Sequence, residues 1–172
     1  MKQVRALVLL LAVAVCVFLA YRWSHSPENS GNPPSPQADT QCDQSLWQYV
    51  YHPTRLQVLA PCISVTGVVD EVRKESDGDI HILFRVDREF ESLLNEKNIS
   101  RQHGDLILEP ICQRSPTQAD AREPCSGYDG PYFEPQIGQR YLAWGTYVYD
   151  ADHGWNELHP VTSMQPLDTV SE

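Results

Sequence analysis

The side chains most able to carry chemistry lie in two short segments, each built around an acidic turn. In the first, Asp79 and His81 follow the turn residues 75–78, and in the second, HGWNELH places Glu157 and His159 on alternate positions. Imidazole nitrogens and carboxylate oxygens are ligands that Zn²⁺ and Mn²⁺ accept. His81, Glu157 and His159 are therefore a candidate metal site, whose bound water would support hydrolysis, for instance of phosphodiesters.

The same residues also have a structural explanation, which the sequence favours. Asp and His side chains cap hairpin turns, and a Glu–His pair can hydrogen-bond a neighbouring loop or strand. The chain has no H-E-x-x-H pattern or comparable ligand spacing. We therefore favour a binding face over an enzyme and predict no cofactor beyond a Zn²⁺ or Mn²⁺ ion at that metal site. This candidate ligand face comprises Asp79, Arg85, Asp152, His153 and Trp155.

Aromatic residues are dense in the second half of the chain, and residues 113–136 read as a long loop. The main explanation for these aromatic residues is that they pack in the core and against the loops. A second explanation is an aromatic platform for an envelope protein or a glycan, displayed on that loop.

The N-terminus reads as a targeting segment, residues 1–23. Lys2 and Arg5 precede an unbroken apolar run, residues 6–21, which is long for a signal peptide and slightly short for a bilayer span. Cleavage after Ala20 would place the bulky Phe18 at the −3 position. We therefore favour an uncleaved signal anchor, a single transmembrane helix with the C-terminal domain outside the cytoplasm. Cleavage, giving a secreted or periplasmic protein, is the alternative.

Three further segments follow the anchor. Residues 24–41 are rich in Pro, Ser and Asn and nearly free of apolar side chains, which predicts a disordered linker. Residues 42–167 are long enough for one domain with a single core. Residues 168–172 form a short tail.

The charge of the exported part is strongly negative. Without Lys2, Arg5 and Arg22, ten Lys and Arg remain against 23 Asp and Glu. Such a field repels phosphate backbones, and no basic stripe with interleaved aromatics is present. Nucleic acid is therefore disfavoured as a partner, and the membrane is expected to be contacted through the N-terminal helix.

Four cysteines lie beyond the apolar run: Cys42, Cys62, Cys112 and Cys125. An even number in an exported domain predicts two disulfides, for which three pairings exist. We favour the local pairs, Cys42–Cys62 and Cys112–Cys125, and expect each to close a loop outside the strands. A four-cysteine zinc site is disfavoured because close C-x-x-C pairs are absent.

The remaining pattern predicts five strands and short helices. A helix capped by Asp43 is expected over 43–52 and another over 88–98, while strands begin near 63, 79, 105, 139 and 155. Gly67 and Gly145 mark bends in the first and fourth strands. We expect the polar face of the second strand, with His81, to meet solvent, and Glu157 and His159 to point outward. This pattern fits a mainly β, five-stranded OB-like Greek-key barrel.

Three motifs carry a resemblance to known sequences: DGDIH, QHGDL and HGWNELHPV. With their spacing they resemble an uncharacterised family of bacterial exported proteins, over nearly all of residues 42–164. The resemblance implies a shared OB-like domain and implies no activity.

Overall fold

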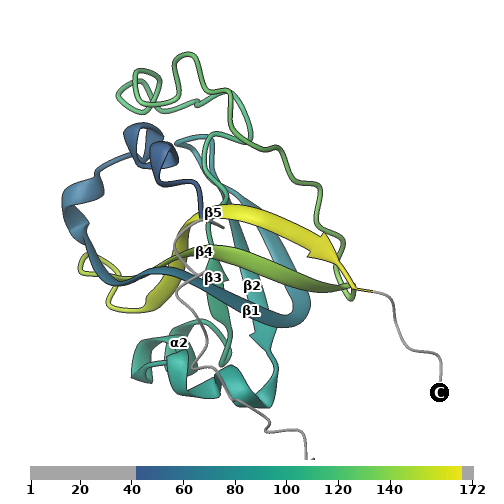
Figure 1. The fold of residues 1–172 in the computed structure, drawn as a ribbon. Helices are drawn as coiled ribbons and strands as arrows, with labels where there is room; N and C mark the ends of the chain where they lie inside the picture. Colours follow the sequence, from purple (N-terminus) through teal and green to yellow (C-terminus); the bar gives the residue numbers. More distant parts are fainter. Residues whose placement is uncertain (1–41, 168–172) are drawn as a thin grey trace, which may run out of the picture. The chain divides into compact units, whose positions relative to one another are not determined.

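A computed structural model describes residues 42–167 of the chain (Figure 1). The predicted anchor (1–23), linker (24–41) and tail (168–172) lie outside the described residues. No helix within residues 42–167 is long and apolar enough to span a bilayer.

Five strands form one mixed sheet, which confirms the prediction of a mainly β domain with short helices. The strands are β1 (Leu56–Lys74), β2 (Ile80–Val86), β3 (Leu106–Leu108), β4 (Arg140–Asp150) and β5 (Asn156–Pro166). Their hydrogen-bonded order, β1-β2-β3-β5-β4, closes on itself because β4 also pairs with β1. All pairs are antiparallel except β3 with β5. The sheet therefore brings β2, β3 and β5 side by side, although they are far apart in sequence.

The helices are short and lie at the margins of the sheet. They are η2 (Gln44–Tyr49), η3 (Pro53–Arg55), η4 (Arg88–Leu93) and α2 (Glu96–Arg101). The Asp43 side chain accepts a hydrogen bond from Ser45 N, as expected of an N-cap. The helix expected over 88–98 is instead two elements, because Asn95 caps a new helix through a capping box with Asn98.

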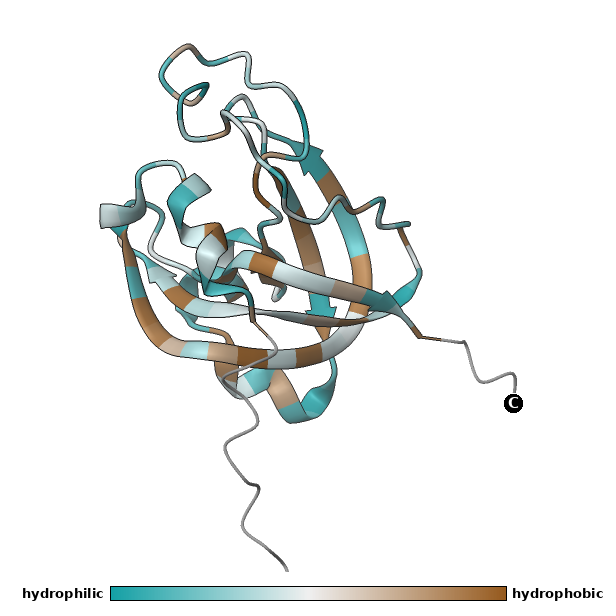
Figure 2. Cartoon of the chain, turned by 45° about the horizontal axis from the view of Figure 1, so that its top comes forward, coloured by the Kyte–Doolittle hydropathy of each residue, from teal (hydrophilic) through white to brown (hydrophobic). Residues whose placement is uncertain are grey.

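The core lies inside the closed sheet. On β2 the alternate residues Ile80, Ile82, Phe84 and Val86 are all buried and belong to one hydrophobic cluster with Val65, Leu106 and Leu158 among others. Apolar bands along the curved strands are visible in Figure 2. The alternation of this strand was predicted correctly on its apolar side.

The prediction for the opposite side of β2 is wrong in part. Asp79, His81 and Leu83 were expected to meet solvent, but all three are buried. Leu83 packs with Ile107 and Trp155 in a small apolar cluster that is separate from the main core. Because this cluster covers the outer face, the polar residues beside it lose their contact with water.

Both favoured disulfides, Cys42–Cys62 and Cys112–Cys125, are present. The expectation that they lie outside the strands is wrong for Cys62, which lies within β1. β1 starts at Leu56 rather than near 63 because residues 56–60 pair with the end of β4, where Leu56 lies opposite Asp150.

Gly67 lies in β1 opposite Val86 of β2, where the two strands approach closely. A Cβ atom at this position would lie 2.4 Å from the Arg85 carbonyl oxygen and 2.8 Å from a ring carbon of Phe84. A backbone carbonyl cannot give way without disturbing the β1–β2 pairing, so the position requires a glycine.

We therefore predict that Gly67→Ala lowers the free energy of unfolding by about 1–3 kcal/mol, the range for overpacking a dense interior. Urea denaturation followed by circular dichroism measures it. Val58→Ala, at a position of the same strand that is 53% exposed, is the control. Equal losses in the two variants would contradict the steric explanation.

Candidate functional site: a buried His–Glu cluster beneath a cleft

Glu109, one residue beyond β3, joins two buried histidines. Its Oε1 lies 2.9 Å from His81 Nδ1 on β2, and its Oε2 lies 2.8 Å from His159 Nδ1 on β5. The backbone fixes Glu109 between these strands, because its N–H donates to the Leu158 carbonyl and its carbonyl accepts from Val161 N–H. The parallel pairing of β3 with β5 thus places one carboxylate within reach of both imidazoles.

Glu157 continues the chain of hydrogen bonds to an aromatic residue. Its Oε1 lies 3.1 Å from His159 Nδ1, and its Oε2 accepts a hydrogen bond from Trp155 Nε1 at 2.8 Å. Glu157 and His159 are fully buried, so the expectation that they point outward is wrong.

A bulge in β5 lets Leu158 and Val161, which are three residues apart, both lie in the main core. Gly145 of β4 pairs with Val161, but Tyr147 pairs with Leu158, so β5 contains one extra residue at His159–Pro160. A bulge disturbs the alternation of side chains between the two faces. Pro160 lies at this bulge, and the strand continues past the proline to Pro166.

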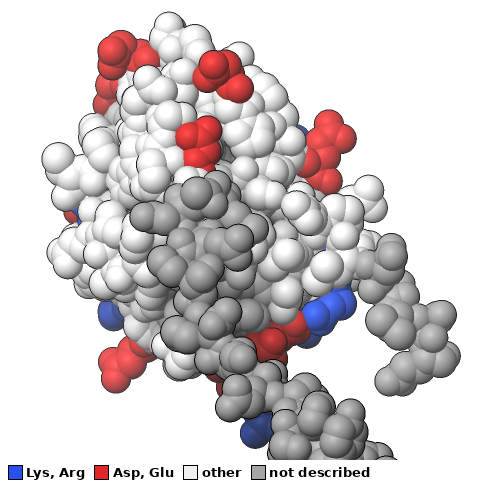
Figure 3. All heavy atoms as spheres, viewed as in Figure 1, with Lys and Arg blue, Asp and Glu red and all other residues white. Residues whose placement is uncertain are grey.

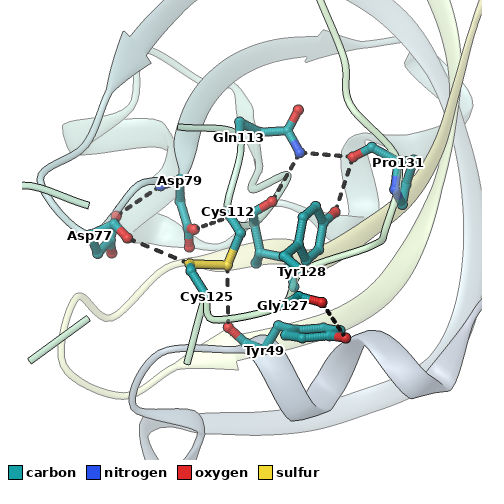
Figure 4. The surroundings of a disulfide bond; sticks show 10 residues. Tyr49, Asp77, Asp79, Cys112, Gln113, Cys125, Gly127, Tyr128 and Pro131 are labelled. Atoms are coloured by element: carbon teal, nitrogen blue, oxygen red, sulfur yellow. Dashed lines mark hydrogen bonds between the residues drawn. A yellow bond between two sulfur atoms is a disulfide. The ribbon is translucent and has the colours of Figure 1, made fainter. Parts of the chain in front are cut away.

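Asp79 is the third buried carboxyl group and lies beside the second disulfide (Figure 4). Its Oδ1 accepts a hydrogen bond from the Cys112 N–H at 2.6 Å. Ligand atoms of Asp79, Glu109 and His159 all lie within 4.8 Å of one another. Among the described residues, this set of carboxylates and a histidine has converging ligand atoms, and the set predicted from the sequence, His81, Glu157 and His159, does not meet the same limit.

A cleft of about 300 Å³ opens above the cluster. The lining residues are charged or polar apart from one aromatic: Arg55, Arg73, Glu75, Asp77, His81, Gln102, Glu109, His153 and Trp155. Glu109 and His81 belong to both the cleft and the buried cluster. Within residues 42–167, the buried Nε2 atoms of His81 and His159 have no hydrogen-bond partner.

The rim of the cleft holds a second carboxylate–histidine pair. Asp150, which is fully buried, lies 2.8 Å from His153 Nδ1 and also pairs with the Arg55 guanidinium. The His153 ring stacks on Trp155 with a centroid distance of 4.4 Å, and His81 meets the same indole at 5.8 Å. Each histidine of the cleft is therefore oriented through Nδ1 by a carboxylate, an arrangement that fixes the ring and its tautomer.

The cluster shifts the protonation of its members. Burial opposes the charge on His159, but Glu109 and Glu157 outweigh it and raise the pKa of this histidine to about 10. Burial likewise opposes charge on Glu109, yet His159 and His81 hold its pKa well below the usual range. For Asp79, burial and the neighbouring Asp77 raise the pKa to about 7. Glu109 and His159 thus form a buried ion pair at neutral pH.

The predicted ligand face is only partly assembled. His153 and Trp155 line the cleft, and Asp79 lies buried below it. Arg85 instead forms an exposed ion pair with Asp70, and Asp152 is exposed in the turn after β4; neither lines the cleft.

The sequence reasoning missed Glu109, Asp150 and Arg55. Asp150 and Arg55 carried a weak local signal, since each flanks a strand end beside a turn. Glu109 follows a short apolar run and precedes a proline, which gives no indication of burial. Comparison with protein-family models, curated proteins and solved structures finds no match for this chain.

The shifted pKa values predict how stability depends on pH. The unfolded pKa of His159 is near 6.5 and the folded one about 10, so its contribution is complete below pH 6.5 and is lost as the pH rises through 10. The Glu109 contribution has the opposite sense: it is present above pH 4.5 and lost as the pH falls further.

We therefore expect Glu109→Gln to lower the free energy of unfolding by about 3–5 kcal/mol near pH 6.5, because it leaves buried imidazoles without their carboxylate. The difference from the wild type should narrow toward pH 10. Denaturant titrations of metal-free protein at several pH values measure both effects. Glu134→Gln, at an exposed carboxylate, is the control, and a pH-independent difference would contradict the ion pair.

Proposed function

We propose that residues 42–167 form an OB-like Greek-key barrel that serves as a binding or assembly module outside the cytoplasm, tethered by residues 1–23. The closed order β1-β2-β3-β5-β4 with one parallel pair supports this barrel class. Two disulfides in a small domain favour an oxidising compartment.

The location can be tested by fusing alkaline phosphatase to the C-terminus of the full-length chain in a bacterial host. This enzyme is active only where its own disulfides form. We expect phosphatase activity in the membrane fraction. Activity in the soluble periplasmic fraction would indicate cleavage, and an inactive fusion would contradict export.

The single observation that carries the binding proposal is the cleft with its two oriented histidines. The lining offers Arg55 and Arg73 as cations, Glu75 and Asp77 as anions, and one indole. Concave sites that combine an aromatic surface with a few fixed polar groups are typical of ligand binding. The lining fits a small polar group that carries donors and acceptors, such as part of an envelope protein or a glycan.

The surface charge supports a partner other than nucleic acid. On the face drawn in Figure 3, Asp and Glu side chains occur at several separate places and Lys and Arg are few. The exported part carries an excess of acidic residues, and such a field disfavours phosphate backbones.

A metal-dependent hydrolase, acting for instance on phosphodiesters, is the second candidate function. The observation that favours it is His81, whose Nδ1 is held by Glu109 while its Nε2 lacks a partner at the floor of the cleft. This is how histidines that ligate metals or transfer protons are positioned.

One experiment separates the two functions. NMR spectra of the purified full-length protein report the ring resonances of His81 and His153. The spectra are recorded as amino acids, monosaccharides or bis(p-nitrophenyl) phosphate are added, each with and without Zn²⁺ or Mn²⁺. The binding module predicts shifts without turnover that His81→Gln abolishes and Tyr132→Ala, at an exposed position, retains. Release of p-nitrophenolate that depends on His81 would establish the hydrolase. No shift and no turnover would overturn both.

A further inference from the structure

We propose that Asp79, Glu109 and His159 bind one divalent transition-metal ion, with Zn²⁺ as the reference ion, at the buried floor of the cleft. This inference goes beyond the binding function, since it holds whether or not the cleft takes an organic ligand. It also replaces the ligand set expected from the sequence with residues that the fold brings together.

The first argument is distance. The ligand atoms of the three residues lie within 4.8 Å of one another. Bonds of about 2.0–2.2 Å around a tetrahedral ion separate neighbouring ligand atoms by roughly 3.4 Å. The set therefore needs only small side-chain movements to close on an ion, and one nitrogen with two carboxylate oxygens suits Zn²⁺.

The second argument is the charge balance of the buried cluster. Three buried carboxyl groups, from Asp79, Glu109 and Glu157, surround the imidazoles of His81 and His159, while Arg55 and Asp150 beside them neutralise each other. The buried carboxyl groups of the cluster outnumber its imidazoles by three to two, and the buried Nε2 of His159 has no hydrogen-bond partner within residues 42–167. A divalent ion would supply a partner for both, and polar groups without one are costly in a buried site.

The third argument is the support around the three ligands. Glu157 lies 3.1 Å from His159 Nδ1, the Cys112 N–H donates to Asp79, and His81 lies 2.9 Å from Glu109 Oε1. Hydrogen bonds from outer residues of this kind fix the orientation of ligating side chains. Three protein ligands leave a fourth position for water or a ligand group, and Glu109 places that centre at the border of the cleft.

A second set, Asp79 with Cys112 and Cys125, also has converging ligand atoms. Its sulfur atoms are bonded to each other in the disulfide (Figure 4), so no thiolate is present to bind an ion. The ion is therefore assigned to the set that contains His159.

The test is Zn²⁺ titration of chelator-treated, full-length protein by isothermal calorimetry, with Co²⁺ absorption to report the coordination number. We expect one ion per chain. Asp79→Asn keeps an oxygen for the Cys112 N–H and should still fold, which circular dichroism checks. Asp79→Asn should weaken the Zn²⁺ affinity by more than about 100-fold. Glu157→Gln, which removes only a hydrogen-bond partner of a ligand, should weaken the affinity by roughly 10–100-fold.

Glu134→Gln is the matched control, because it removes an exposed carboxylate outside the cluster, and its affinity should equal that of the wild type. Two outcomes would overturn the proposal: a wild type that binds no Zn²⁺, or an Asp79→Asn variant that folds and binds as tightly as the wild type. Neither outcome depends on the organic probes, so failure of the metal site and failure of the binding function remain distinguishable.

Discussion

The structure depends on one carboxylate that is shared by two buried imidazoles. Glu109 contacts His81 on β2 and His159 on β5, while its own backbone bridges the strands through Leu158 and Val161. A buried group of charged side chains of this kind stabilises the fold only while all its members are present. The loss of one leaves an unpaired charge in a medium that cannot solvate it. The parallel β3–β5 contact spans just two residue pairs. The side chains of the cluster therefore reinforce the shortest junction of the sheet.

Up to the bulge at His159–Pro160, β5 alternates regularly: Glu157 and His159 face the buried cluster, and Leu158 faces the apolar core. The extra residue of the bulge then returns Val161 to the core face, three positions after Leu158. Opposite the bulge, Gly145 allows the close approach, since a Cβ atom there would lie 2.8 Å from the Pro160 carbonyl oxygen.

Much of the fold could be predicted because its causes are local. The alternation over residues 80–86 and the caps of the short helices act within a few residues, and the two cysteine pairs are separated by only 20 and 13 positions. The site could be predicted only in part. Five site residues can be recognised in the sequence because they are chemically reactive or aromatic types close to turns: His81, His153, Trp155, Glu157 and His159. Glu109 can be recognised only once the parallel pairing of β3 with β5 has placed it between β2 and β5. Burial of the second face of β2 was missed for the same reason, since the cover comes from Trp155, more than 70 positions away.

The loop closed by Cys112–Cys125 is fastened to the β1–β2 turn as well as to itself. Arg114 N–H donates to the Gly78 carbonyl, Thr117 and Gln118 donate to Ser76, and Cys112 donates to Asp79. The cluster is therefore completed by a segment whose position is fixed by a sulfur–sulfur bond. The Cys112–Cys125 bond and these backbone hydrogen bonds act on the same turn. The position of the Asp79 carboxyl is therefore set by a loop that begins 33 residues further along the chain.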